Sequence, residues 1–318
     1  TSSGTTALHT ALASIGIKEN DEVITTDFSF VASASSILMQ GANPVFCDIE
    51  KETFNIDSLL IEEKITNKTK AILPVHLYGH PCDMKLINEI ASDNDLLVLE
   101  DACQAHGAMY NRKKVGGIGD LGVFSFYPTK NMTTGEGGIV VTNDEKIAKK
   151  AKLFQNHGQH EKYMHGSLGY NYHMTNISAS IGLVQLKKLD SWNNKRRQNA
   201  EYLTNCFSKI NGISTPVVKE NAAHCFHQYS VIIEDHFSLK RDDVTKYLQE
   251  KGVGFGIHYP LPLHKQPVFG ENKDVFPVSD DLSKRVLSLP VHPLLSRQDL
   301  DLIVNCFKEM REEKWMLA

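Results

Sequence analysis

The chain has 318 residues, of which 41% are hydrophobic and 23% charged, as in an ordinary globular protein. Its formal net charge of −4 gives no general attraction to nucleic acid or to an anionic membrane. No apolar run is long enough to cross a bilayer, and a chain of this length is expected to form one large domain and a smaller one.

Six cysteines are scattered along the chain, at positions 47, 82, 103, 206, 225 and 306. None forms a C-x-x-C pair, so we expect neither a disulfide framework nor a zinc site, and no other metal. The expected compartment is a reducing cytosol. The chain opens at Thr1, without an initiator methionine or a signal peptide, on a motif that normally follows a strand. We therefore expect the native protein to be longer.

The first predicted element is a helix over residues 7–15, where apolar residues recur at helical spacing before Gly16. Residues 1–6 are small and form the turn that opens this helix. Such a turn offers free backbone N–H groups and the positive end of the helix dipole, which suits a phosphate. A plain N-cap explains the same residues and is the commoner reason for them.

Strands and helices then alternate along the chain. Strands are predicted at residues 23–25, 44–49, 71–76 and 96–100, and helices at residues 32–40 and 84–91. This alternation indicates βαβ units and a mostly parallel sheet with both faces covered.

Two further strands are predicted at residues 121–126 and 138–142. Only residues 127–137 join them, and this segment contains Pro and Gly. Too little chain remains for a crossover helix, so we expect this pair to be antiparallel.

One long helix is predicted over residues 175–207, with Ile177, Ile181 and Val184 on one face and a charged, solvated middle. Gly212 and Pro216 follow this helix, and the sequence pattern changes there. A strand predicted at residues 229–233 and a helix at residues 242–250 then indicate a smaller α+β domain. The expected fold is therefore of the α/β class, with a large domain over residues 1–206 and a small C-terminal domain over residues 207–318.

Three reactive side chains follow two of the predicted strands. Asp101 ends a buried strand, Ser125 lies at the end of the next, and Lys130 follows five residues later, before a glycine cluster at residues 135–138. Sites in open α/β sheets lie at the carboxyl ends of strands. A carboxylate for a pyridine nitrogen, a hydroxyl for a phosphate and an amine for an aldehyde make the layout expected for pyridoxal phosphate (PLP).

Each of these residues also has a plainer explanation. A lysine on a loop is usually a solvated charge, and it is the context that favours a Schiff-base role for Lys130. Gln104 is placed to bond the ring's phenolic oxygen. His106 either orients Asp101 or is a core histidine. Phe30 is placed to stack on the ring, although Phe28 is an alternative for the same role.

A set of motifs that keeps its order over nearly the whole chain resembles the DegT/StrS family of sugar aminotransferases. The motifs are SGTTALH (3–9), DEVI (21–24), FVA (30–32), PVHLYG (74–79), EDACQAHG (100–107), SFYPTKN (125–131), GEGG (135–138), GYNY (169–172), QL (185–186), RR (196–197), HY (258–259) and LP (289–290). Each piece alone is weak, and the set is specific.

The resemblance implies the type I, aspartate-aminotransferase-like fold of PLP enzymes, with a three-layer αβα large domain, and a homodimer with sites at its interface. It implies Lys130 as the Schiff-base lysine and Asp101 as the pyridinium partner. The other cofactor residues that it implies are Gln104 at the ring oxygen, Phe30 on the ring face, Thr5, Thr6 and Ser125 at the phosphate, and Asn171 at the phosphate of the neighbouring subunit.

The sequence departs from the family pattern in three places. Family members usually carry an N-terminal helix and an edge strand before the Ser-Gly-Thr motif, and both are expected to be missing here. His173 stands where the family commonly has Arg or Lys, and a histidine is a weaker, pH-dependent cation for a substrate. Cys103 stands where alanine is frequent, which is a mild change.

We expect amino transfer from glutamate to a keto group of a nucleotide-linked sugar, for amino-sugar and surface-polysaccharide biosynthesis. His173, His258 and Tyr259 are expected on the substrate side, together with His264. Alternatives are a cyclitol or aromatic-precursor acceptor, a regulatory or inactive PLP-binding member, and a PLP-dependent sugar dehydratase. Such dehydratases carry histidine at the lysine position, so Lys130 argues against them. A NAD enzyme is disfavoured because no strand precedes a G-x-G-x-x-G motif.

Overall fold

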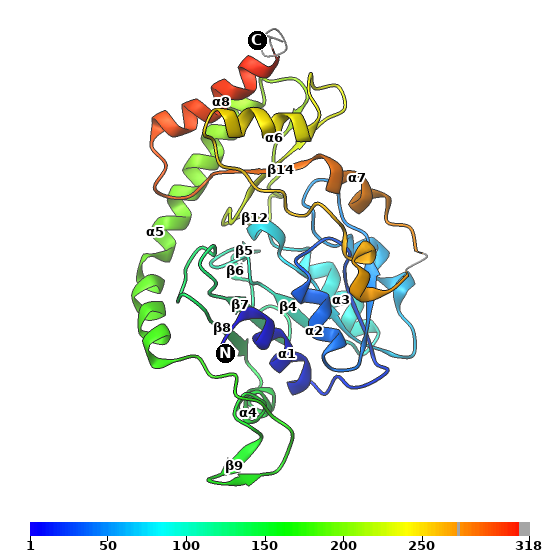
Figure 1. The fold of residues 1–318 in the computed structure, drawn as a ribbon. Coiled ribbons are helices and arrows are strands. Elements are labelled where there is room, and N and C mark those ends of the chain that lie inside the picture. Colours follow the sequence, from blue (N-terminus) through cyan, green and yellow to red (C-terminus); the bar gives the residue numbers. More distant parts are fainter. Residues whose placement is uncertain (272–273, 312–318) are drawn as a thin grey trace.

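The structure, a computed structural model, describes residues 1–271 and 274–311 (Figure 1). Its main sheet has the strand order β2-β1-β3-β4-β7-β8. These strands are β1 (Glu22–Thr26), β2 (Asn43–Cys47), β3 (Thr69–Leu73), β4 (Leu97–Asp101), β7 (Leu121–Ser125) and β8 (Gly138–Thr142). All neighbouring pairs are parallel except β7 and β8, which are antiparallel, so both expectations for this sheet are confirmed.

Helices cover both faces of the main sheet. They are α1 (Gly4–Ser14), α2 (Ala32–Leu38) and α3 (Met84–Asp93). Side chains alternate along a strand, so Leu73 and Leu99 pack in one core with α1 and α2, whereas Ile72 and Val98 pack in another with α3. The result is the expected three-layer α/β arrangement.

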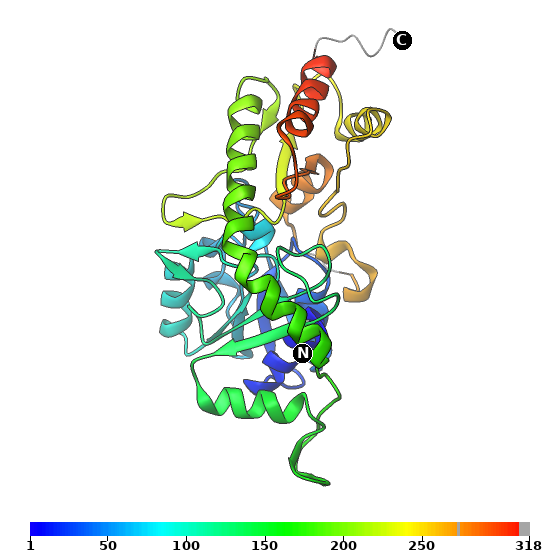
Figure 2. The same ribbon diagram turned by 90° about the vertical axis from the view of Figure 1, so that its left-hand side faces the viewer.

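The long helix α5 (Asn176–Phe207) begins at an N-cap, because the hydroxyl of Thr175 accepts a hydrogen bond from Ser178 N at 3.1 Å. It confirms the helix expected over residues 175–207. Figures 1 and 2 show it running along one side of the molecule, from the main sheet to the C-terminal elements.

The C-terminal part contains a smaller sheet with the strand order β11-β13-β14 and three helices. Their bounds are β11 (Ile213–Ser214), β13 (Tyr229–Ile233), β14 (Val286–Leu289), α6 (Arg241–Glu250), α7 (Pro277–Arg285) and α8 (Arg297–Arg311). The expected strand at residues 229–233 and the helix at residues 242–250 are present as β13 and α6.

The C-terminal part has an apolar core of its own. The C-terminal core includes Leu203 and Phe207 from the end of α5, whereas Leu282 of α7 packs in the core of the main sheet. The chain thus returns to the large sheet after entering the smaller one. The domain division at residues 206 and 207 stays a prediction, and residues 272–273 and 312–318 of the expected small domain lie outside the described residues.

The elements β11, β14, α7 and α8 were not predicted from the sequence, and neither were several others. The others are the helix α4 (Glu145–Phe154), the hairpin of β9 (Gln159–Glu161) and β10 (Met164–His165), and a small sheet of β5 (Met109–Tyr110), β6 (Lys113–Lys114) and β12 (Ala222–Ala223). Short 3-10 turns complete the fold at η1 (Ser58–Leu60), η2 (Glu62–Lys64), η3 (Leu77–Gly79), η4 (Leu263–Lys265) and η5 (Pro267–Phe269). The hairpin projects beyond α4 at the bottom of Figure 1.

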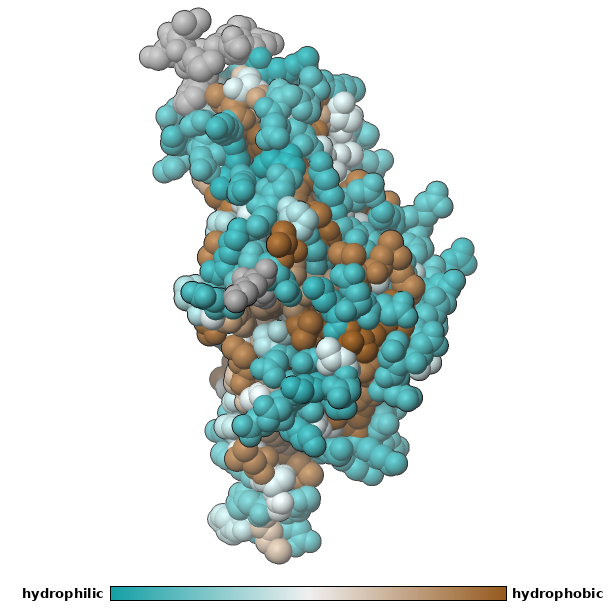
Figure 3. Space-filling view, turned by 90° about the vertical axis from the view of Figure 1, so that its right-hand side faces the viewer, coloured by the Kyte–Doolittle hydropathy of each residue, from teal (hydrophilic) through white to brown (hydrophobic). Residues whose placement is uncertain are grey.

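The surface seen in Figure 3 mixes hydrophilic side chains with several separate hydrophobic patches. Among the helices that the structure describes, none combines the length and the apolar character needed to cross a membrane.

Candidate active site

A cavity of about 580 Å³ lies where β4 and β7 end and α1 begins. The side chains expected at the three ends of a PLP molecule meet on its wall. Of the predicted site residues, the wall includes Thr5, Phe30, Asp101, Gln104, Ser125, Lys130, His258 and Tyr259. The neighbouring carboxyl ends of parallel strands explain why Asp101 and Ser125 meet.

Asp101 is buried and held by two donors. Its Oδ2 accepts a hydrogen bond from Ser33 Oγ at 2.8 Å, and its Oδ1 accepts one from Cys103 N at 3.1 Å. Within the described part of the chain it forms no ion pair. A buried carboxylate on a cavity wall with acceptor capacity left and no cation in contact fits a protonated ring nitrogen.

Lys130 lies at the end of a short turn, where its backbone N–H donates to Tyr127 O at 2.9 Å. Burial lowers the pKa of its ammonium group below the usual value, against the opposing effects of Cys103 and Asp101. This direction favours the free amine, the form that reacts with an aldehyde.

The N-terminus of α1 packs closely against Ser125. A Cβ atom added at Gly4 would lie 2.7 Å from Ser125 Cβ and 3.2 Å from Cys103 Sγ, so only glycine permits this approach. The first turn of the helix and a hydroxyl therefore share one corner of the cavity. Such a cradle fits a phosphate group.

Thr6 has a different place from the one expected. Its Oγ1 accepts from Ser3 N at 2.9 Å and its backbone N–H donates to Ser3 Oγ at 3.1 Å, which makes a capping box. Thr6 is not part of the cavity wall, whereas Thr5 is. The N-cap interpretation of this turn is thus correct, and the phosphate interpretation stays a prediction beside it.

Gln104 is held in one orientation. Its Oε1 accepts from Tyr78 N at 2.9 Å, so its Nε2 is the donor, and it donates to the hydroxyl of Tyr259 at 3.1 Å. One hydrogen of this amide remains for another acceptor. That arrangement fits the phenolic oxygen of a PLP ring.

The structure separates the two phenylalanines that the sequence left as alternatives. Phe28 is fully buried in the core, whereas Phe30 is 54% exposed and lies on the cavity wall. The rings of Phe30 and Tyr259 have their centroids 6.5 Å apart. Of these two phenylalanines, Phe30 is therefore the one that can reach a ligand in the cavity.

Four other histidines and amides named from the sequence lie elsewhere. Asn171 and His173 are exposed, bond each other at 3.1 Å and are not on the wall of this chain's cavity. His264 is buried away from the wall, where its Nδ1 lies 2.7 Å from Asp27 Oδ2.

His106 packs against the rings of Phe124 and Phe126 and makes no hydrogen bond to Asp101. A core position fits His106, but neither of its ring nitrogens makes a hydrogen bond to the described residues, so it is not a core histidine with its hydrogen bonds satisfied.

Sequence reasoning missed several wall residues. Ser33 reaches Asp101 from α2, and Tyr127, Glu136, His227 and Gln228 line the cavity. His227 is 7% exposed, and burial followed by the charge of Lys130 keeps its pKa well below the ordinary value. A histidine and a glutamine just before β13 were the available signal, but nothing in their spacing ties them to Lys130.

The residues on the wall therefore fit PLP at each of its three ends. They offer a carboxylate without a cation, an amine with a lowered pKa, and a glycine-lined cradle beside a hydroxyl. The fit rests on this chain's own donors and acceptors.

Comparisons with known proteins agree with this geometry. A sequence model of the DegT/DnrJ/EryC1/StrS aminotransferase family matches residues 1–308. The chain is 42% identical over 312 residues to the pleiotropic regulatory protein of Geobacillus stearothermophilus, with 96% of this chain and 82% of that protein covered. It is 40% identical over 316 residues to the GDP-perosamine synthase of Escherichia coli O157:H7, with 98% and 85% covered.

The fold also matches solved structures. A sugar aminotransferase from Streptococcus pneumoniae in its PMP form superimposes with a TM-score of 0.93 at 29% identity, with 99% of this chain and 86% of that chain covered. The expected PLP-aminotransferase fold is thereby confirmed.

Proposed function

The chain belongs to the DegT/DnrJ/EryC1/StrS aminotransferase family, and from this premise we propose that it moves an amino group from glutamate to a keto group of a nucleotide-linked sugar. It is an aminotransferase, and its cofactor is PLP, as in this family. The proposed part is the donor, the acceptor and the role in making amino sugars for polysaccharide or a related glycoconjugate.

The cofactor supplies an electron sink that stabilises the carbanion formed when a Cα proton leaves. In our proposal Lys130 holds the cofactor's aldehyde and, once released, carries the proton between carbon atoms. Asp101 would keep the ring nitrogen protonated, because its carboxylate supplies the opposite charge. Ser125 and the first turn of α1, with Thr5, bind the phosphate, while Gln104 and Phe30 fix the ring's oxygen and face.

One observation carries the proposal. The Lys130 amine, the Asp101 carboxylate and the Gly4–Ser125 cradle lie on the wall of a single cavity, where one small molecule could contact all three. The cavity is also lined by His258 and Tyr259 on the side that we assign to the sugar. A relative named GDP-perosamine synthase supports a nucleotide-linked sugar as the acceptor.

We further propose that the enzyme acts as a homodimer. A stripe of apolar side chains on α5 is exposed, with Ile177 78%, Ile181 43% and Val184 55% exposed. Asn171 and His173 are exposed near its start, on a surface from which they could serve the cavity of a neighbouring copy. The six cysteines are all free, which agrees with a reducing cytosol as the place of the reaction.

The function is tested by a coupled assay of 2-oxoglutarate formation from glutamate across a panel of keto-sugar nucleotides. We expect turnover with one or more members of the panel and none without an acceptor. The matched control is the Lys130→Ala variant with the same panel.

The same assay separates the alternative acceptors. Turnover with cyclitols or free keto acids but with no nucleotide-linked sugar would contradict the proposed substrate class while leaving amino transfer intact. Failure with every acceptor, although glutamate still converts the bound cofactor, would point to an acceptor outside the panel's chemistry and reject the sugar nucleotides tested.

A further inference from the structure

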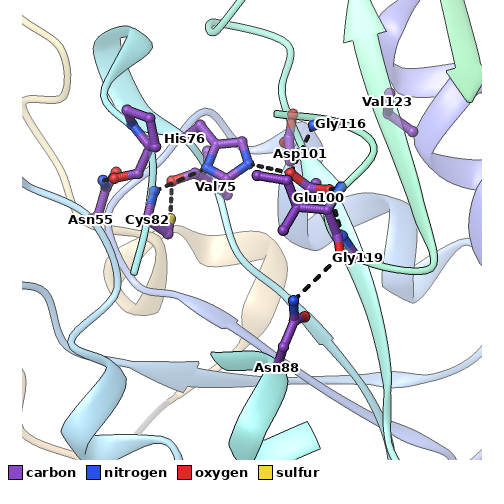
Figure 4. A network of polar contacts seen from close by, with 12 residues as sticks. Asn55, Val75, His76, Cys82, Asn88, Glu100, Asp101, Gly116, Gly119 and Val123 are labelled. Carbon is purple, nitrogen blue, oxygen red and sulfur yellow. Dashed lines mark hydrogen bonds and ion pairs between the residues drawn. The ribbon is translucent and has the colours of Figure 1, made fainter. Parts of the chain in front are cut away.

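The carboxylate of Glu100 lies at the centre of a fully buried polar network (Figure 4). Four donors point at its two oxygens. Oε2 accepts from His76 Nε2 at 2.9 Å and from Gly116 N at 2.7 Å, and Oε1 accepts from Ile118 N at 2.6 Å and Gly119 N at 2.7 Å. The side chain is therefore held from two separate segments of the chain.

The ring of His76 is fixed in one tautomer by this network. Its Nδ1 accepts a hydrogen bond from Cys82 N at 3.1 Å, so the proton lies on Nε2 and is donated to Glu100. Burial acts to raise the pKa of Glu100, but the hydrogen bonds from His76 and from the loop amides outweigh it and hold the pKa below its ordinary value. Glu100 is thus an ionised carboxylate inside the protein.

The network reaches Asp101 through the backbone. Asp101 N donates to Pro74 O at 2.9 Å, and His76 N donates to Asp101 O at 3.0 Å. Because side chains alternate along β4, Glu100 points away from the cavity while Asp101 points into it. The hydrogen bond between Glu100 and His76 therefore holds the segment of residues 74–76, to which the backbone of Asp101 is hydrogen-bonded.

The same carboxylate also holds the loop before β7. The amides of residues 116, 118 and 119 bind Glu100, and the strand that follows ends at Ser125 on the cavity wall. The Glu100 side chain on β4 thus joins the segment that follows β3 to the loop that precedes β7, and both β4 and β7 deliver residues to the cavity wall.

The chemistry of the network requires a carboxylate. Burying a charge costs free energy that an apolar side chain of similar size would not, so packing alone does not explain Glu100. Four converging donors need about four lone pairs, which an ionised carboxylate supplies and an amide oxygen does not. In a glutamine the NH₂ group would face a donor.

We propose that Glu100 and His76 are positioning residues that set the Asp101 carboxylate against the cofactor's ring nitrogen. The inference rests on the proposed role of Asp101. It assigns to this buried pair an effect on the cofactor, beyond an effect on stability.

The test compares Glu100→Gln with the wild-type holoenzyme and with Asp101→Asn. We expect Glu100→Gln to lower kcat about tenfold to hundredfold, the range found for residues that orient catalytic groups, with little change in the KM for glutamate. We also expect the pH midpoint of the bound cofactor's visible absorbance to move in the same direction as in Asp101→Asn. An unchanged midpoint and kcat in Glu100→Gln would overturn the inference.

Asp48→Asn is the matched control for buried carboxylates. Asp48 is also buried, and it accepts hydrogen bonds from Ile49 N, Val278 N, Ser279 N and Ser279 Oγ, none of them on the cavity wall. This variant should lose thermal stability while keeping the cofactor's pH midpoint. If it moves the midpoint as much as Glu100→Gln does, the effect is a general loss of stability and the inference fails.

Two variants at His76 keep the test decisive if Glu100→Gln does not fold. The amide nitrogen of a glutamine lies near the position of a histidine Nε2, whereas an asparagine reaches only the position of Nδ1. His76→Gln should therefore keep the wild-type midpoint and His76→Asn should shift it, and equal midpoints would overturn the inference. A midpoint unaffected by Asp101→Asn itself would instead reject the proposed role of Asp101.

Discussion

At the scale of single residues, the proposed role of Lys130 requires an ammonium group that gives up its proton readily. Its burial lowers the pKa, and the histidines around it are kept neutral by the same desolvation, with the charge of Lys130 as the next cause for His106 and His258. Neutral histidines add no positive charge beside the amine of Lys130. A general acid–base group works best when its pKa lies near the working pH.

The Lys130→Ala variant should lose the visible absorbance of the lysine-bound cofactor and all measurable turnover, because among the described residues no other amine lies on the cavity wall. The Lys130 side chain makes no hydrogen bond to any of the described residues, so its removal should leave the fold intact. Absorbance spectra and the coupled assay measure both effects, with the exposed Lys68→Ala as the control. Retained turnover would refute the assignment.

Because of His106, the free energy of unfolding should fall as the solution becomes acidic. Burial, with a contribution from Lys130, lowers its pKa from 6.5 to about 3, so the unfolded chain takes up the proton first. Its contribution to stability is complete above pH 6.5 and is lost as the pH falls toward 3. Between pH 6 and pH 5 this single group should cost about 1 kcal/mol of unfolding free energy.

The His106→Leu variant removes that titration while filling the same space between two phenylalanine rings. Urea unfolding at pH 7, 6 and 5 should show a smaller loss of stability on acidification than in the wild type. An equal loss in both proteins would mean that other groups, such as His80 with its pKa lowered to about 4, account for the acid sensitivity.

At the scale of elements, the sequence predicted the main sheet because its signals were local. Apolar runs marked the strands, and the short link at residues 127–137 predicted the antiparallel pair. The same locality brought out Asp101, Ser125 and Lys130, which lie on neighbouring strand ends. Ser33 escaped because a serine within a helix gives no sign of a partner 68 residues away.

Other elements were missed although a signal was present. Asp144 caps α4 through hydrogen bonds to the backbone N–H groups of Lys146 and Ile147, a standard helix start that the sequence displays. The hairpin after it has short strands with exposed, mixed side chains and no alternating pattern. Its shape depends on the glycines at its base, Gly158 and Gly169, whose backbones touch.

The contact between α1 and β7 predicts the effect of Gly4→Ala. The added Cβ would lie 2.7 Å from Ser125 Cβ, so the helix start must move away from the cradle. Overpacking of this kind costs about 1–3 kcal/mol, and where that cost falls on the bound state it corresponds to about a fivefold to 150-fold loss of affinity for PLP. Titration of the apoenzyme with PLP measures it.

Gly254→Ala serves as the control for this variant, because a Cβ there meets nothing within 4 Å. It should bind PLP as the wild type does. If Gly4→Ala also bound PLP with wild-type affinity, the first turn of α1 would not be the phosphate cradle.

At the scale of the whole molecule, α5 serves two environments. Its C-terminal half packs in the core of the small sheet through Leu203 and Phe207, which are fully buried. Its N-terminal half carries the exposed stripe of Ile177, Ile181 and Val184. The sequence pattern predicted this apolar face but not what covers it. Apolar stripes of this kind on a surface helix mark places where a protein associates.

If the α5 stripe is the dimer interface, charging it should separate the subunits. The double variant Ile181→Lys and Val184→Lys would bury two ammonium groups without partners in a homodimer, which is strongly unfavourable. We expect a monomer by light scattering at micromolar concentration, together with a loss of turnover, because Asn171 could no longer reach the phosphate of the neighbouring copy.

Leu59→Lys is the control, since Leu59 is 79% exposed on η1 of the large domain. It should remain dimeric and active. A double variant that stays dimeric would move the interface elsewhere, and an active monomer would show that each chain completes its own site.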